Sequence, residues 1–335
     1  MIKFKNIAVF IISGATVLSL ASCSMISEPD VTNKIVNPSV SMGLAEEVRK
    51  PSSGVTKIAT VNYADYEISE SDDLKTMEQK IETKYGLDIV FGEDIRTEFS
   101  DESEKLVVEK YTNEENIKKA LITFDGIFKI YPKTFFYQLR RSEDSPVKIY
   151  LTGAIKSLDY PDASINAFTS DSDSKGESYL VVDIAGQNGI FNPVDIMHEI
   201  VHLTDFKLKT LGLLKAEEWS ALNPEGFSYR DKLENKSVDK YNFAQAEYCP
   251  LKEGTSPSDV YFICPYSQLN EYEDRATLLT NALVFALYGY EVEPEVYKCP
   301  HLQAKMEYWI EQVKKGFDTS YWDNTPWEDS YSKLK

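Results

Sequence analysis

The chain has 335 residues, of which 42% are hydrophobic and 12% aromatic. This composition excludes a disordered chain and is enough to bury the core of one large or two modest domains. The 54 acidic residues outnumber the 36 basic ones, and the net charge of -18 argues against a nucleic-acid partner, because phosphates would be repelled. Only three residues are histidines: His198, His202 and His301.

Residues 1–22 have the pattern of a bacterial lipoprotein signal peptide. Lys3 and Lys5 precede an apolar run at residues 7–20, which is too short for a comfortable transmembrane span. The sequence Leu-Ala-Ser-Cys then ends at Cys23, where cleavage leaves a thiol that can carry lipid. The mature chain keeps 34 basic residues against 54 acidic ones, a net charge of -20.

The expected location is extracytoplasmic, on the outer membrane or the cell surface of a bacterium. Acyl chains such as palmitate on Cys23 are the only predicted contact with the membrane. Ser24, in place of Asp, favours an outer over an inner membrane. Residues 23–55 are rich in Ser, Pro, Asn and Val without a period, which predicts a flexible tether.

Residues 56–145 are predicted to form the helical N-terminal part of the folded domain. Apolar residues at helical spacing predict a helix over 74–85, which Gly86 ends, and residues 87–91 follow as a short strand. The sequence Thr-Asn-Glu-Glu at 112–115 fits a capping box. The apolar face after it predicts a long helix that ends near the next proline.

Residues 146–335 complete the domain. Strands are predicted at 147–151 and 179–184, and helices at 192–209, 270–288 and 300–315. β-Branched and aromatic residues mark the strands, whereas Asn192 followed by Pro193 marks a helix start. The expected fold class is α+β, mainly helical around a small sheet, in a single domain at 56–335.

Three cysteines remain in the mature domain: Cys249, Cys264 and Cys299. An exported protein can oxidise two of them, and Cys249 with Cys264 is the preferred disulfide because the two are close in sequence and bracket a polar loop. The chain has no C-x-x-C unit, which argues against a metal cluster of thiolates.

His198, Glu199 and His202 form an H-E-x-x-H motif on the helix predicted at 192–209. Helical positions four apart share a face, so both imidazoles can reach one Zn²⁺ at about 2.0–2.1 Å. Glu199 can then accept a proton from a zinc-activated water as that water attacks a carbonyl. The motif predicts zinc-dependent hydrolysis with Glu199 as general base.

The spacing alone does not choose a third metal ligand. Asp205 and Leu208 stand where the longer motif H-E-x-x-H-x-x-G-x-x-H needs Gly and His, and His301 starts a helix beside a proline. The open candidates are the carboxylates Glu217, Glu218, Glu271, Glu273 and Asp274. The later cluster lies on a second helix that can approach the histidines from the side, although Glu273 also has the spacing of a capping residue.

The segment YSQLNEYEDRA at 266–276 resembles the anthrax lethal factor-type metalloproteases. In that family a tyrosine precedes the third ligand by seven residues, within a tyrosine-to-N-E-x-E pattern. HEIVHLTD also matches the family's placement of an aspartate, here Asp205, three residues after the second histidine. The lipobox and the Glu-Asp helix start resemble the zinc-binding metallopeptidase lipoproteins of gut anaerobes. The resemblance covers roughly residues 147–287.

This resemblance implies a zincin-like domain of the gluzincin type, with Glu273 as the third zinc ligand. It implies that Tyr266 donates its hydroxyl to the oxyanion, with a packed loop aromatic as the alternative. Asp205 and Asp274 become candidates for orienting the imidazole N–H groups, or else are solvated helix charges. The strand at 179–184 is expected to edge the cleft and pair with an extended peptide.

The predicted function is a zinc metallopeptidase of the cell envelope that holds one Zn²⁺ and acts on peptides or proteins. One alternative is a catalytically silent surface lipoprotein that binds glycan or protein on the same fold. Another keeps the metal but hydrolyses a glycan-linked amide. The aromatic-rich segment at 211–265 can shape a substrate pocket or pack as core, and its sequence does not rank these.

Overall fold

The structure is a computed structural model, and its described residues are 66–100, 105–140, 145–158, 165–170, 177–186, 192–230, 248–249, 256–288 and 298–334. The predicted signal peptide, Cys23 and the tether at 23–55 lie outside this part of the chain. Within it, no helix is both long and apolar enough to cross a membrane.

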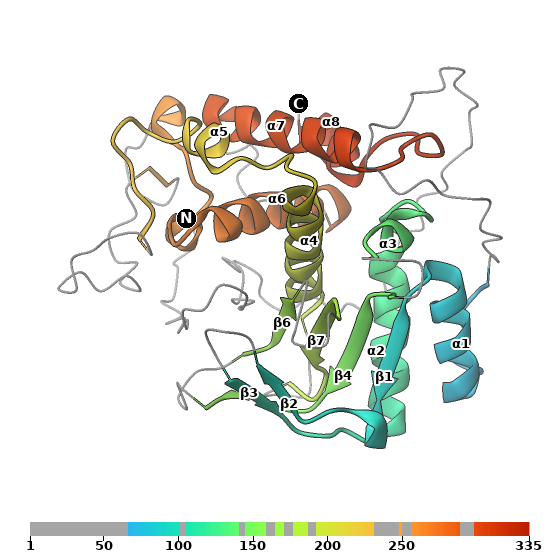
Figure 1. The fold of residues 1–335 in the computed structure, drawn as a ribbon. Coiled ribbons are helices and arrows are strands. Elements are labelled where there is room, and N and C mark those ends of the chain that lie inside the picture. Colours follow the sequence, from blue (N-terminus) through green and yellow to red (C-terminus); the bar gives the residue numbers. More distant parts are fainter. Residues whose placement is uncertain are drawn as a thin grey trace, which may run out of the picture.

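The described residues form an α+β fold in which helices predominate over two small sheets (Figure 1). The larger sheet contains, in spatial order, β1 (Asp88–Phe91), β4 (Lys148–Thr152), β7 (Tyr179–Asp183) and β6 (Ala167–Ser170). Its first three strands are parallel, and β6 runs antiparallel to β7. The smaller antiparallel sheet contains β2 (Glu98–Ser100), β3 (Lys105–Val108) and β5 (Ile155–Ser157).

Strand β7 lies inside the larger sheet, between β4 and β6. All five of its residues are buried and the first four are apolar, and such an apolar run is typical of a strand covered on both faces. The prediction that residues 179–184 edge the cleft is therefore wrong. Of the described strands, β6 occupies that edge of the sheet, and it packs against α4 (Pro193–Thr210), the helix that carries the H-E-x-x-H motif.

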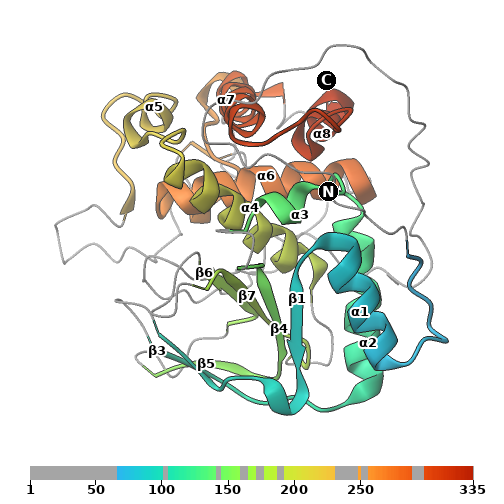
Figure 2. The ribbon, with the colours of Figure 1, turned by 45° about the vertical axis from the view of Figure 1, so that its right-hand side comes forward.

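Helices α1 (Leu74–Tyr85) and α2 (Glu114–Phe128) pack against each other, and α1 also contacts β1 (Figure 2). Gly86 ends α1 as predicted, because the chain there adopts a φ of 70°, which glycine tolerates. The predicted capping box is shifted by one residue. The side chain of Asn113, not that of Thr112, accepts a hydrogen bond from a first-turn N–H of α2.

Three predicted helices are confirmed to within one residue: α4, α6 (Glu271–Tyr288) and α7 (Pro300–Gly316). Helix α6 lies between α4 on one side and α7 with α8 (Pro326–Leu334) on the other (Figures 1 and 2). The sequence did not predict α8, whose Trp327 is fully buried against Trp309 of α7 at a centroid distance of 5.5 Å. Helix α6 therefore packs against other helices on both sides, and this packing positions the first turn of α6 beside α4.

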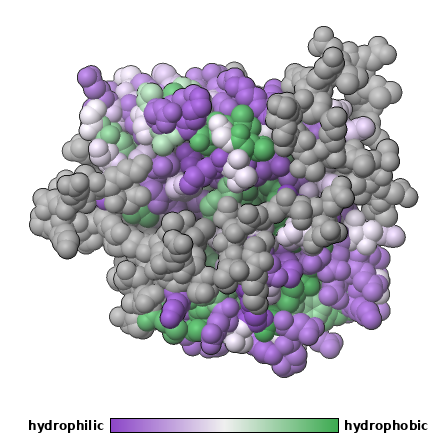
Figure 3. Space-filling view, viewed as in Figure 1, coloured by the Kyte–Doolittle hydropathy of each residue, from purple (hydrophilic) through white to green (hydrophobic). Residues whose placement is uncertain are grey.

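Two short helices, α3 (Phe135–Gln138) and α5 (Ala216–Ser220), were also not predicted. Helix α5 packs against α6, so its segment forms part of the core around the site. On the face drawn in Figure 3, hydrophilic residues predominate along α7 and along α1. The apolar side chains of these helices are therefore largely directed inward.

Candidate metal centre

Helix α4 brings its two histidines onto one face. The helix begins where the side chain of Asn192 accepts a hydrogen bond from the N–H of Val194 at 3.0 Å, with Pro193 in the first turn. His198 and His202 follow one turn apart, and their Nε2 atoms lie 3.1 Å from each other. Both side chains are buried, so the two nitrogens face a common point away from bulk water.

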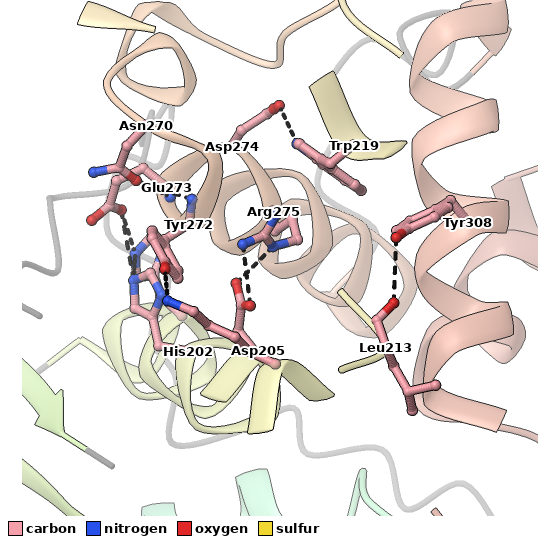
Figure 4. Close-up of polar contacts among 12 residues, drawn as sticks. His202, Asp205, Leu213, Trp219, Asn270, Tyr272, Glu273, Asp274, Arg275 and Tyr308 are labelled. Carbon is pink, nitrogen blue, oxygen red and sulfur yellow. Dashed lines mark hydrogen bonds and ion pairs between the residues drawn. The ribbon is translucent and has the colours of Figure 1, made fainter. Parts of the chain in front are cut away.

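Helix α6 adds the carboxylate of Glu273 to the same point. The side chain of Asn270 caps the helix by accepting hydrogen bonds from the N–H groups of Tyr272 and Glu273 at 3.0 and 2.9 Å (Figure 4). The Oε2 atom of Glu273 lies 3.1 Å from Nε2 of His198 and 3.7 Å from Nε2 of His202. The capping role therefore belongs to Asn270, which leaves the Glu273 side chain to meet the histidines.

The other predicted candidates for a third ligand lie elsewhere or have other partners. Glu218 on α5 accepts hydrogen bonds from Lys215 and Tyr308. His301 stacks on the Tyr261 ring at a centroid distance of 3.6 Å, and its Nε2 lies 3.1 Å from a backbone oxygen. Within the described residues, Glu273 is the carboxylate that joins His198 and His202 in a group able to hold a metal ion.

The ligand atoms of His198, His202 and Glu273 form a triangle whose size fits a small cation. Ligand atoms bound tetrahedrally at about 2.0–2.1 Å lie about 3.3 Å from one another. The three edges between the His198, His202 and Glu273 ligand atoms measure 3.1, 3.1 and 3.7 Å. Two imidazole nitrogens and one carboxylate oxygen at these separations can hold one metal ion.

The charges of the three residues are strongly coupled. Burial tends to raise the pKa of Glu273, but the two histidines outweigh it and bring that pKa down to about 2. Burial lowers the pKa of His198, which keeps this imidazole neutral, as metal binding requires. For His202 the Glu273 carboxylate outweighs burial and raises the pKa to about 9. In the metal-free protein His202 therefore holds a proton in the position where a metal would bind.

The carboxyl group of Glu199 interacts electrostatically with His202 and Glu273 and has no polar partner in the described part of the chain. Its side chain is fully buried, and neither carboxyl oxygen has a hydrogen-bond partner in the described part of the chain. Burial raises its pKa to about 8. A buried polar group without a partner costs about 1–3 kcal/mol, so Glu199 is an unsatisfied acceptor next to the place where a ligand of the metal would sit.

Tyr266 also reaches the site. It lies in the short segment Pro265–Gln268, and its ring centroid is 6.5 Å from that of His198. Burial, followed by the charge of the Glu273 carboxylate and the hydrogen bond to it, raises the pKa of the Tyr266 hydroxyl far above the ordinary value. The hydroxyl is therefore placed to donate a hydrogen bond within the site, and its role as oxyanion donor stays a prediction.

Asp205 and Asp274 do not orient the imidazoles through hydrogen bonds. Both carboxylate oxygens of Asp205 accept hydrogen bonds from the guanidinium of Arg275, with Oδ2–Nε at 2.6 Å and Oδ1–Nη2 at 3.1 Å (Figure 4). Asp274 accepts hydrogen bonds through Oδ2 from Trp219 at 2.9 Å and from Lys305 at 2.7 Å. The expected imidazole contacts are absent among the described residues because buried cations occupy these carboxylates instead. Neither aspartate is a solvated helix charge, since both are fully buried.

Arg275 and Lys305 are the residues that sequence reasoning missed. Each is a buried charged residue on a helix whose buried side chains are mainly apolar. That pattern predicts a buried ion pair, but the partner of Arg275 is 70 residues away in sequence. Spacing along the chain could not identify it.

Part of the aromatic-rich segment at 211–265 packs as core behind α6. Trp219, Tyr229 and Phe262 are buried, and the hydroxyl of Tyr229 donates a hydrogen bond to Asp274 at 2.8 Å. Other aromatic residues of this segment, at 231–247, lie outside the described residues. The described part thus supports the start of α6 from the side opposite α4.

The predicted disulfide between Cys249 and Cys264 is not formed. Cys249, Cys264 and Cys299 are all buried, and none of the three takes part in a disulfide. Sγ of Cys249 accepts a hydrogen bond from Gln268 at 3.4 Å, and Sγ of Cys264 lies 3.9 Å from the hydroxyl of Ser267. The Cys249 and Cys264 thiols therefore pack as small core residues near the segment that carries Tyr266.

Comparison with protein-family models, with curated proteins and with solved structures finds no match to this chain.

Proposed function

We propose that this chain is a zinc-dependent metallopeptidase with a zincin-like fold of the gluzincin type. One observation carries the proposal. Two imidazole nitrogens and the Glu273 carboxylate converge within 3.1–3.7 Å, and the buried carboxyl group of Glu199, which has no hydrogen-bond partner among the described residues, interacts electrostatically with His202 and Glu273. A His₂Glu donor set with an adjacent free carboxylate is the combination that hydrolytic zinc sites use, because it leaves one coordination position open.

The donor set favours zinc over the other common divalent ions. Magnesium and calcium prefer sites made of oxygen ligands, whereas imidazole nitrogen suits zinc. His198, His202 and Glu273 would hold the ion. Zinc, when bound, supplies a Lewis acid that polarises a carbonyl and lowers the pKa of water.

The chain's own residues account for the proton transfers and for binding. Glu199 accepts the proton of the attacking water and passes it to the departing amine, so that the peptide C–N bond breaks into a carboxylate and an amine. A cation close by favours the charged form of a carboxyl group, which makes Glu199 a base at neutral pH. Tyr266 donates its hydroxyl to the negative charge that develops on the carbonyl oxygen.

The proposed setting is the cell envelope of a bacterium. It rests on the signal peptide at 1–22 and the lipidation residue Cys23, with the acyl chains as the one attachment to the membrane. Peptide or protein substrates are the proposed partners, and nucleic acid is not among them because the mature chain is strongly acidic.

The test combines metal content with hydrolysis. Elemental analysis of the purified mature protein should give one zinc per chain, and a library of unstructured peptides should be cleaved. Glu199→Gln should keep the zinc and lower the rate by about 100- to 10,000-fold, the usual contribution of a general base. Protein that binds zinc but cleaves no peptide would support the silent binding lipoprotein, or an enzyme for non-peptide amides, instead. Protein that binds no zinc would refute the proposal.

A further inference from the structure

Three consecutive residues at the start of α6 each have a buried partner on another helix. Glu273 meets the histidines of α4, and Arg275 binds Asp205 of α4 (Figure 4). Asp274 binds Lys305 of α7 at 2.7 Å. Helix α6 is therefore tied to α4 by the ligand contact, by the ion pair and by a hydrogen bond from Lys209 to the Tyr272 hydroxyl. The second of these has no part in the chemistry proposed above.

The ion pair lies within one helical turn of the ligands on both helices. Asp205 is three residues after His202, and Arg275 is two residues after Glu273. At a rise of 1.5 Å per residue, these separations are about 4.5 and 3 Å along the two helix axes. A shift of either helix at the ion pair would thus be transmitted almost undiminished to the ligand atoms.

The contact between Asp205 and Arg275 is directional and dry. Two parallel hydrogen bonds of 2.6 and 3.1 Å join them, and the exposed fractions of the side chains are 0% and 4%. The guanidinium centre also lies 5.3 Å from the Trp219 ring centroid and 5.2 Å from that of Tyr272, so its plane is confined. Such a two-point fork fixes both distance and orientation, which an apolar contact does not.

Stability alone does not explain this arrangement. Removing two charges from water is costly, and apolar residues of similar volume would hold two helices together at least as well. What a buried ion pair can add is specificity, because it holds the elements that it joins in one relative position. Here the elements are the two helices that carry the metal ligands.

We propose that Asp205 and Arg275 are positioning residues that hold the carboxylate of Glu273 at the two histidines and so set the metal affinity of the site. The proposal rests on the metal site proposed above. It predicts that breaking the fork weakens metal binding beyond what the loss of fold stability explains.

The experiment measures zinc affinity by competition with a chromophoric chelator, and the absorption spectrum of the cobalt(II) form. Asp205→Asn keeps the shape of the side chain and removes its charge. Arg275→Lys keeps both charges and removes the two-point fork. Each variant should lower zinc affinity by about 10- to 100-fold, as loss of a residue that orients a ligand does, and should alter the visible band intensities of the cobalt form.

Lys84→Met is the matched control. Lys84 forms an ion pair with Asp125 at 2.8 Å, with exposed side-chain fractions of 9% and 5%, and this pair joins α1 to α2, away from the ligands. The control should lose stability in urea and keep wild-type zinc affinity and the wild-type cobalt spectrum. Arg275→Lys preserves the charge balance, so it decides the question even where Asp205→Asn does not fold.

The outcomes separate the two proposals. Wild-type protein that binds no zinc refutes the metal site itself. Wild-type protein that binds zinc, with unchanged affinity and spectra in folded Asp205→Asn and Arg275→Lys, overturns only the positioning role. An equal loss of affinity in Lys84→Met would also overturn it, because general destabilisation would then explain the effect.

Discussion

Replacing Glu199 by glutamine should stabilise the metal-free protein, although it removes the proposed catalytic base. The Glu199 carboxyl group is buried without a partner, and burial raises its pKa from 4.5 to about 8. A carboxyl group whose pKa is higher in the folded state than in the unfolded state destabilises the fold once it must ionise. This cost grows as the pH rises from the unfolded-state pKa to the folded-state pKa. At 1.36 kcal/mol per pKa unit, the cost at pH 7 is on the order of 3 kcal/mol. Glutamine has the same shape and does not ionise, so it avoids this cost.

Urea unfolding of the chelator-treated protein at several pH values measures the effect. The free energy of unfolding of Glu199→Gln should exceed that of the wild type, and the difference should grow by roughly 2.5 kcal/mol between pH 5 and pH 7. Glu115→Gln serves as the control, because Glu115 is an exposed residue of α2 paired with Lys119 and should show no such growth. A Glu199→Gln variant that is less stable than wild type at pH 7, or a difference independent of pH, would refute the reasoning.

Three further predictions concern the ligands and the core behind them. Loss of a residue that only orients a ligand typically lowers metal affinity by about 10- to 100-fold, and Glu273→Gln should lower zinc affinity by more than that. Competition with a chelator measures the affinity, and an unchanged value would exclude Glu273 as a ligand. Because the pKa of His202 is about 9 without metal, a proton competes with zinc below that pH, and the affinity should rise by up to about tenfold per pH unit between pH 7 and 9. A zinc affinity that does not change between pH 7 and pH 9 would contradict this competition between zinc and the proton on His202. Lys305→Met should cost about 3–5 kcal/mol in urea unfolding, because it leaves the Asp274 charge buried and unpaired; a loss below about 1 kcal/mol would show that the pair behaves like an exposed one.

Local patterns in the sequence predicted most of the helices. Gly86, Asn192 and the apolar periodicity give bounds for α1, α4 and α7 that agree with the structure to within one residue. These signals are local, because caps and periodicity act within one or two turns. Strands β2, β3, β5 and β6 have only three or four residues, which is too short to show a period, and β5 pairs with β3 across about 50 residues of sequence.

The position of β7 was predictable and was predicted wrongly. Its five residues form a continuous buried run, and this pattern is typical of an internal strand, whereas an edge strand alternates or carries charge. The resemblance to a protease family outweighed that signal. Helix α8 is a different case, since its burial depends on Trp327 meeting Trp309 across two helices, which no local pattern indicates.

For the candidate site, the sequence identified the ligands better than their surroundings. His198 and His202 follow from one helical turn, and Glu273 required the resemblance. The ion pairs of Asp205 with Arg275 and of Asp274 with Lys305 join residues 70 and 31 positions apart. Such pairs exist only after the helices have packed, so the sequence suggested imidazole contacts for two aspartates that the fold assigns to cations.

The central claim is that His198, His202 and Glu273 hold one zinc ion. Anomalous diffraction recorded at the zinc edge, from a crystal of the mature protein grown with one equivalent of zinc, tests it most directly. We predict a single peak about 2.0–2.2 Å from Nε2 of both histidines and from a carboxylate oxygen of Glu273. A peak bound by other residues, or a well-ordered site with no peak, would contradict the account.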